Sequence, residues 1–159
     1  MNFIMKKNIQ SFSLACLFII ACNSGNNGQP QIANNNSTVE SPDVTGKHFT
    51  GSISNGMKGD SISFDVSADG KKLTNLTFKG YWRCSGKLES TTAGPEGAFD
   101  IVNGKVSGHI SEPPNGGATA WRFDLDASIQ GKKASGTFRM NINNLGCDTY
   151  KLNWTAIGN

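Results

Sequence analysis

The chain has 159 residues, of which 36% are hydrophobic and 17% are charged, a composition typical of a globular protein with room for one domain. Its formal net charge is +3 at pH 7, and Lys6 and Lys7 near the start contribute two of these charges. The other Lys and Arg residues are interleaved with Asp and form no basic stripe, so we expect no nucleic acid as a partner.

A basic segment and a short apolar run begin the chain. The first residues, MNFIMKKNIQ, carry two lysines and no acidic residue, and SFSLACLFIIA follows them. A membrane-spanning helix needs about 20 apolar residues, so a run of about ten is too short to cross a bilayer. The pattern predicts a signal peptide over residues 1–21.

The apolar run ends in Ile19-Ile20-Ala21-Cys22, which resembles the lipobox of bacterial lipoproteins. The resemblance implies cleavage before Cys22, a diacylglyceryl thioether on its sulfur and an N-acyl chain such as palmitate. Membrane lipid is therefore an expected partner, because two or three acyl chains hold a protein durably at a bilayer. The alternative is an ordinary secretory signal cleaved after Ala21, which would leave a free thiol.

The residue after the lipidated cysteine bears on the destination of such a protein. In diderm bacteria an acidic residue there often marks retention in the inner membrane, and Asn23 is not acidic. The resemblance thus implies a lipid-anchored protein of the bacterial cell envelope, in the outer membrane and facing the periplasm.

Residues 22–44 read as a lipidated N-terminus and a linker. The sequence NSGNNGQPQIANNNSTVESPDV is rich in Asn, Ser, Gly and Pro and offers few apolar side chains to bury. We therefore predict a disordered linker, which as a flexible coil would hold the following domain roughly 25 Å from the bilayer.

From residue 45 onward, apolar residues recur with a period of two, and clusters of Gly, Asn and Asp separate the runs. This alternation is typical of half-buried antiparallel strands, so we predict one all-β domain over residues 45–159. The expected strands lie near residues 47–54, 61–67, 73–83, 98–102, 105–111, 118–130, 133–142 and 148–157.

Two hairpins can be placed in register. Asn103-Gly104 suits a two-residue type I′ turn, in which both central residues have positive φ. Gly131-Lys132 is the loop that makes both faces of the second hairpin match. The predicted cross-strand pairs are Ile101 with Val106, Phe99 with Gly108, Leu125 with Phe138, Phe123 with Met140, Trp121 with Ile142 and Asp124 with Arg139. A single antiparallel meander of about eight strands favours an up-and-down barrel, with a β-sandwich as the alternative.

Cysteine use is simple once the signal peptide is removed. Cys16 leaves with the signal and Cys22 takes lipid, which leaves Cys84 and Cys147. In an oxidising envelope a disulfide between them would close a loop of about 64 residues and contribute roughly 4 kcal/mol. Zinc is the alternative, but the sequence has no CxxC motif, so we expect neither a metal nor a cofactor.

The Gly-rich hairpins, the stretch ISFDVSADGKKLTNLTFKG and the late cysteine before YKLNWTA resemble an uncharacterised all-β domain that recurs in exported bacterial proteins. The resemblance spans most of residues 45–159. It implies the fold and the compartment, and it transfers no site residue.

No pattern in the sequence indicates an enzyme. His48 and His109 read as strand surface residues, and no serine lies in a nucleophile elbow. Nothing selects one pair of carboxylates for glycoside cleavage. We therefore expect a non-enzymatic lipoprotein with a structural or ligand-binding β domain. A hydrolase is a third hypothesis, which would require two carboxylates, or a His beside a nucleophile, in one cleft.

Aromatic residues supply the candidate binding site of an alternative hypothesis, a lipoprotein that binds carbohydrate or a small apolar ligand. The candidates are Tyr81, Trp82, Trp121 and Trp154. The three tryptophans are in phase with core positions, which favours a packing role, whereas Tyr81 is out of phase and is expected to point outward. A barrel interior offers a second place for an apolar ligand, unless the side chains of the protein fill it.

Overall fold

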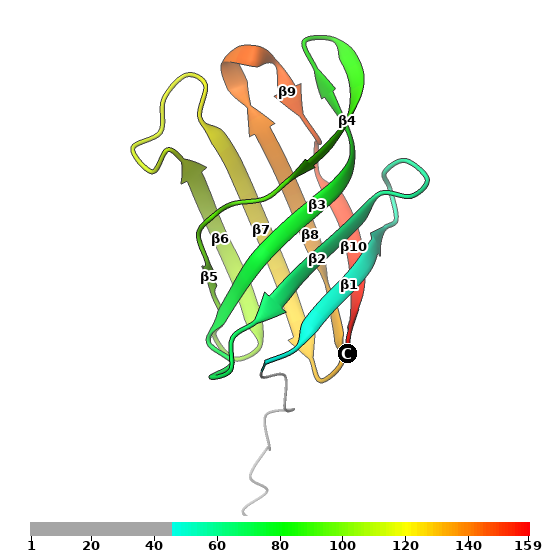
Figure 1. Ribbon diagram of the computed structural model, residues 1–159, viewed down its shortest axis with the longest axis vertical. Helices are drawn as coiled ribbons and strands as arrows, with labels where there is room; N and C mark the ends of the chain where they lie inside the picture. The colour runs from blue at the N-terminus through cyan, green and yellow to red at the C-terminus, as the bar shows by residue number, and fades with distance from the viewer. Residues whose placement is uncertain (1–45) are drawn as a thin grey trace, which may run out of the picture. The chain divides into compact units, whose positions relative to one another are not determined.

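Antiparallel strands form a closed ring in the computed structural model, which describes residues 46–159 (Figure 1). The elements in chain order are β1 (His48–Ile53), β2 (Ser61–Val66), β3 (Lys72–Cys84), β4 (Lys87–Ala93), β5 (Phe99–Asp100), β6 (Lys105–Glu112), β7 (Trp121–Gln130), β8 (Lys133–Ile142), the 3-10 helix η1 (Asn143–Leu145), β9 (Cys147–Asp148) and β10 (Leu152–Gly158). The predicted signal peptide, the lipidated Cys22 and the linker over residues 22–44 lie outside the described residues.

The ring runs in the order β1-β2-β3-β9-β8-β10, and it closes because β10 pairs with β1 as well as with β8. From the other edge of β8 the sheet continues through β7 to β6, while β4 and β5 pair with β3. All of these pairs are antiparallel. The closed ring confirms the predicted all-β barrel over the β-sandwich alternative.

Most strands lie where the alternation predicts them, with two differences. The strand β4 occupies a stretch in which no strand was expected, because its seven residues are mostly exposed and show no apolar alternation. It forms by backbone pairing with β3, from Phe78 opposite Ala93 to Cys84 opposite Lys87. The last predicted strand is divided into β9 and β10, with residues 149–151 between them.

The structure confirms the register of the second hairpin and the turn of the first. The predicted ladder pairs of Ile101 with Val106 and of Phe99 with Gly108 do not form, because β5 pairs with β3 instead and places Phe99 opposite Leu73. Asn103 and Gly104 have φ of 51° and 70°, and Val102 pairs with Lys105 on either side of them. In the second hairpin the pairs include Leu125 with Phe138, Phe123 with Met140 and Asp124 with Arg139. A slip of one residue would have exchanged the inner and outer faces, so the apolar pattern selects the register.

Large side chains fill the interior of the barrel. Phe49 stacks on Phe64 with ring centroids 5.0 Å apart, and Phe64 meets the edge of Trp154 at 5.6 Å. Phe78 stacks on Phe138 at 5.6 Å. These rings are almost completely buried, so the protein's own aromatic residues occupy the space in which a barrel of this kind can hold a small ligand.

Two seams of the barrel bring backbones close together. A Cβ at Gly51 in β1 would overlap the carbonyl oxygen of Thr155 in β10. A Cβ at Gly136 in β8 would overlap the carbonyl oxygen of Asp126 in β7. Glycine at these positions therefore permits the approach of neighbouring strands that the ring requires.

A disulfide joins Cys84 at the end of β3 to Cys147 in β9. This is the predicted cysteine pair. Next to it, the Ser85 hydroxyl donates a hydrogen bond to the carbonyl oxygen of Leu145 at 3.0 Å. The covalent bond and this hydrogen bond hold the β3–β4 turn against the segment that contains η1 and β9.

The two ends of the described chain lie at one end of the barrel (Figure 1). Gly46 N–H donates to the carbonyl oxygen of Ser67, and Asn159 N–H donates to that of His48. The β3–β4 turn, η1 and β9 lie at the opposite end. Over residues 46–159, the structure has no helix with the length and apolar character needed to cross a membrane.

Candidate ligand-binding site

The structure separates the four aromatic candidates. Trp154 is a core residue with 2% of its surface exposed. Trp82 is 7% exposed and stacks on the partly buried Trp121 with ring centroids 5.2 Å apart and planes 11° from parallel. Tyr81 is 43% exposed, in agreement with its outward phase. Packing therefore accounts for Trp121 and Trp154, while Tyr81 and Trp82 reach a surface hollow.

This hollow, called here the tyrosine hollow, has a volume of about 250 Å³. It is lined by Asn55, Gly56, Met57, Asp60, Tyr81, Trp82, Arg83, Leu88, Asp148, Thr149, Tyr150 and Leu152. Seven large apolar side chains are exposed in the described part of the chain, and four of them line this hollow: Met57, Tyr81, Leu88 and Tyr150. Exposed apolar side chains gathered at one concave place are typical of a binding surface.

Tyr150 is more exposed than Tyr81, with 61% of its surface accessible. Its backbone has a φ of 55°. A left-handed conformation costs a bulky residue about 1–2 kcal/mol, so its surroundings must fix it. The Tyr150 N–H donates to Oδ1 of Asp148 at 2.7 Å. The preceding residue, Thr149, is buried and accepts a hydrogen bond from Met140 N–H at 2.9 Å.

An ion pair holds the Asp148 carboxylate that anchors Tyr150. Arg139 donates from Nε to Oδ1 of Asp148 at 3.0 Å and from Nη2 to Oδ2 at 2.6 Å. This two-point contact raises the pKa of Arg139, chiefly through the hydrogen bonds to Asp148 and also through charge attraction. The predicted pairing of Asp124 with Arg139 is correct as a register, but the guanidinium binds Asp148 while Asp124 binds His109.

Asp60 fixes the opposite wall of the tyrosine hollow. Its carboxylate is 4% exposed and accepts hydrogen bonds from the N–H of Met57 at 2.8 Å and of Tyr81 at 3.2 Å. A side chain at Gly80 would collide with this carboxylate. Asp60 therefore positions the turn after β1 and the backbone of Tyr81 at the same time.

A second link ties the turn after β1 to β10. Asn55 donates from Nδ2 to the carbonyl oxygen of Lys151 at 2.9 Å, and its Oδ1 accepts from Asn153 N–H at 2.6 Å. The side chain thus satisfies two backbone groups beside the irregular segment 149–151. These hydrogen bonds hold two walls of the tyrosine hollow, which are far apart in the sequence, in fixed positions relative to each other.

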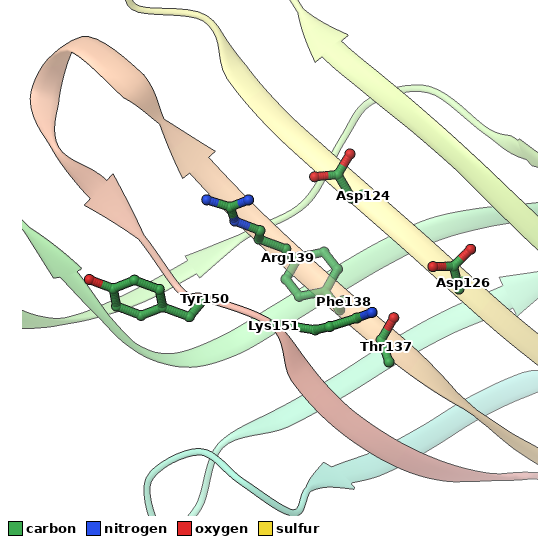
Figure 2. Close-up of a pocket in the computed structure, with 7 residues that line it drawn as sticks. All are labelled: Asp124, Asp126, Thr137, Phe138, Arg139, Tyr150 and Lys151. Carbon is green, nitrogen blue, oxygen red and sulfur yellow. The ribbon is translucent and has the colours of Figure 1, made fainter.

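A polar trough of about 480 Å³ lies beside the tyrosine hollow (Figure 2). Its lining residues are Asp124, Asp126, Thr137, Phe138, Arg139, Tyr150 and Lys151. Figure 2 shows the two aspartates on β7 and the Lys151 side chain lying across β8. Tyr150 lines both depressions, so it forms the ridge between them.

Sequence reasoning missed Tyr150 because of a change of phase. Cys147 and Thr149 are buried at odd positions, whereas Leu152, Trp154 and Ala156 are buried at even positions. One extra residue between β9 and β10 turns Tyr150 outward, although the alternation of β10 would point it inward. The only sequence signal for its role is that a tyrosine, which has a polar hydroxyl group, falls at a position where the alternation predicts a buried side chain.

The tyrosine hollow combines flat apolar rings with groups that form hydrogen bonds. Arg83 supplies a guanidinium, and Asp148 supplies a carboxylate already oriented by Arg139. Such a surface suits a ligand that has both apolar faces and hydroxyl or charged edges. Among residues 46–159, no group of three His, Cys, Asp or Glu side chains is placed to hold a metal ion.

Comparison of the chain with models of protein families, with curated proteins and with solved structures gave no match.

Proposed function

We propose that this protein is a lipid-anchored lipoprotein of the bacterial cell envelope whose barrel binds carbohydrate in the tyrosine hollow. The observation that carries the binding proposal is the exposed pair Tyr81 and Tyr150 on one concave surface, with the Tyr150 backbone in a left-handed conformation. An unfavourable backbone conformation that presents an aromatic ring to solvent is a reason to infer a function for the ring.

The chemistry of the tyrosine hollow favours a sugar over a purely apolar ligand. Sugar rings present C–H faces that stack on aromatic rings, and their hydroxyl groups suit the guanidinium of Arg83 and the carboxylate of Asp148. An apolar ligand would need an empty interior, but that space contains rings such as Phe64, Phe78 and Phe138. The surface hollow is therefore the better supported site.

The anchor proposal rests on the lipobox-like sequence that ends at Cys22. The position of the tyrosine hollow is consistent with it, since the described chain enters the barrel at Gly46 and the hollow lies toward the other end. A tether attached at Gly46 therefore joins the barrel away from the hollow and leaves the hollow uncovered.

The binding proposal is tested by isothermal titration calorimetry with the full chain in detergent micelles, using neutral hexose oligomers and uronate oligomers as probes. We expect Tyr150→Ala to weaken binding about 2- to 10-fold, the loss of one stacking contact. Alanine meets the same left-handed backbone as tyrosine, so this variant removes the ring without relieving the backbone. Val102→Ala is the matched control, because Val102 is exposed but lines neither depression.

Two results would contradict the binding proposal. One is the absence of binding for every oligosaccharide class. The other is equal affinity of the wild-type and Tyr150→Ala proteins, which would place the sugar elsewhere.

The anchor is tested separately with Cys22→Ser. We expect the variant to keep its signal sequence and to lose its acyl chains, because the thioether requires the cysteine sulfur. Mass spectrometry of the purified protein and fractionation of cells give the readout. Unchanged processing and unchanged acylation in the variant would refute the anchor.

A further inference from the structure

An imidazole on β6 lies between a hydroxyl group and a carboxylate. His109 Nδ1 is 2.7 Å from Oδ1 of Asp124, and His109 Nε2 is 2.8 Å from Oγ of Ser111. This is the order of groups in a serine nucleophile relay, with the carboxylate on one ring nitrogen and the hydroxyl on the other. The three side chains lie outside the tyrosine hollow.

Strand geometry builds this cluster. Residues two apart in a strand point to the same face, which brings His109 and Ser111 together on the outside of β6. In the antiparallel register, Asp124 of β7 lies opposite His109, and Arg122 lies opposite Ser111. The cluster therefore depends only on regular pairing of two long strands.

The hydrogen bonds define the tautomer of His109. An ionised carboxylate only accepts hydrogen bonds, so Asp124 orients the ring with the proton on Nδ1. The lone pair of Nε2 is then free to accept the proton of the Ser111 hydroxyl. A base in this state is placed to activate the hydroxyl as a nucleophile.

Arg122 of β7 is the cross-strand neighbour of Ser111. The Arg122 guanidinium donates to the carbonyl oxygens of Gly117 at 3.1 Å and Ala120 at 3.4 Å, which secures the loop between β6 and β7. These hydrogen bonds hold the guanidinium at that loop, while the backbone of Arg122 lies opposite Ser111. A cation on the neighbouring strand favours negative charge on a substrate that extends from Ser111 toward the loop between β6 and β7.

We propose that Ser111, His109 and Asp124 hydrolyse carboxylic esters on the outer face of β6 and β7, an activity independent of the proposed carbohydrate binding. Ser111 Oγ forms a bond to the acyl carbon while its proton passes to His109 Nε2. The bond from the acyl carbon to the alcohol oxygen breaks, and the alcohol leaves with that proton. Water then attacks the acyl-serine, His109 takes a proton from it and returns it to Ser111, and the carboxylic acid is released.

The surroundings indicate the shape of the ester. About half of the His109 side chain is exposed, so the face admits an ester carried on a large molecule. Asp124 also lines the polar trough, where Lys151 and Arg139 supply cations. A substrate that extends from Ser111 past Asp124 would therefore reach the trough.

The test uses the full chain in detergent micelles with two probes, a fluorophosphonate that phosphonylates reactive serines and p-nitrophenyl acetate. We expect labelling on the peptide that contains Ser111 and none in Ser111→Ala. We expect His109→Asn to lower both labelling and ester turnover at least about 10-fold, because a relay fails when any one member is removed.

The chain offers matched controls for both residues. Ser107 lies on the same face of β6, but its hydroxyl donates directly to Asp126 at 2.7 Å without an imidazole between them. His48 pairs with Asp65 at 2.6 Å in the same cross-strand manner. Ser107→Ala and His48→Asn should therefore keep labelling and turnover within about 2-fold of wild type.

Thermal melting of every variant shows whether the barrel remains folded, so that a loss of activity can be assigned to the side chain. Labelling of a serine other than Ser111 would overturn the proposal. Turnover that persists in Ser111→Ala but disappears in His109→Asn would also overturn it, since the imidazole itself would then be the nucleophile. An absence of both labelling and turnover would refute the activity while leaving carbohydrate binding unaffected.

Discussion

Asp65 illustrates how a single outward carboxylate joins three strands of the barrel. Its Oδ1 contacts His48 Nδ1 of β1 at 2.6 Å, and its Oδ2 accepts from Asn75 Nδ2 of β3 at 2.7 Å. The hydrogen bond from Asn75 lowers the pKa of Asp65 most, followed by that from His48. Asn75 itself has a φ of 51°, at the place where the pairing of β2 with β3 shifts register.

The lowered pKa of Asp65 predicts a pH dependence of stability. Its contribution is complete above the ordinary pKa of an aspartate and disappears as the pH falls through the lowered folded-state pKa. Because the group is partly exposed, we expect Asp65→Asn to cost about 1 kcal/mol or less at neutral pH. The difference from wild type should vanish in acid, as measured by urea titrations over a pH series.

Asp100→Asn is the control for that series, since it removes a carboxylate from the exposed ion pair with Lys72. An undiminished difference between Asp65→Asn and wild type in acid would show that the carboxylate charge is not responsible.

The structural role of a residue could be predicted from the sequence where one simple rule decides it. The pairing of Cys84 with Cys147 follows once the signal peptide and the lipid remove the other cysteines. The burial of Trp154 follows from its phase in the last strand. Asp60 and Tyr150 could not be assigned, because their roles depend on a turn and an extra residue whose geometry arises only in the assembled barrel.

At the level of strands, the sequence predicts the strands that have one apolar face and misses β4, which has none. The β7–β8 hairpin could be placed in register because both of its faces match. The strand β4 has no buried face, so its formation depends on the free backbone edge of β3. Alternation of apolar and polar residues appears where one face of a strand is buried. A strand that forms by backbone pairing without burial shows no such alternation in its sequence.

The β7–β8 hairpin predicts a sharp contrast between its two faces. Phe138 is 1% exposed, so Phe138→Ala should lower the free energy of unfolding by roughly 3–5 kcal/mol through lost burial and a cavity. Asp124→Ala removes a half-exposed pair with His109 and should cost about 0–1 kcal/mol. Two denaturant titrations measure the contrast, and a larger loss at Asp124 would contradict the described burial.

At the scale of the whole molecule, closure combines non-local pairing with one covalent link. The first strand of the ring pairs with the last, so the barrel is complete only when both chain ends are in place. The disulfide joins β3 to β9 across a sequence separation of 63 residues. The closed topology could be predicted from the number and direction of strands, whereas the role of β9 could not, because two residues are too few to show a period.

The disulfide should contribute strongly to stability. Replacing Cys84 and Cys147 together by Ser should lower the free energy of unfolding by about 4 kcal/mol, because the unfolded chain regains the freedom of a long loop. Denaturant titration of the double variant measures the loss. In the native protein, alkylation without reductant should leave both thiols unmodified, and two reactive thiols would contradict the bond.

Gly46, where the described chain enters, and the tyrosine hollow lie toward opposite ends of the barrel, which determines how the domain meets mechanical force. A pull between a tether at Gly46 and a ligand held in the hollow acts along the length of β1. That strand pairs on one edge with β2 and on the other with β10. The ladders on both edges are then loaded together in shear, whereas peeling a strand from a sheet edge opens its hydrogen bonds one after another. Rupture requires many hydrogen bonds to break at once, so the barrel should stay closed under a tension that would unzip an open sheet.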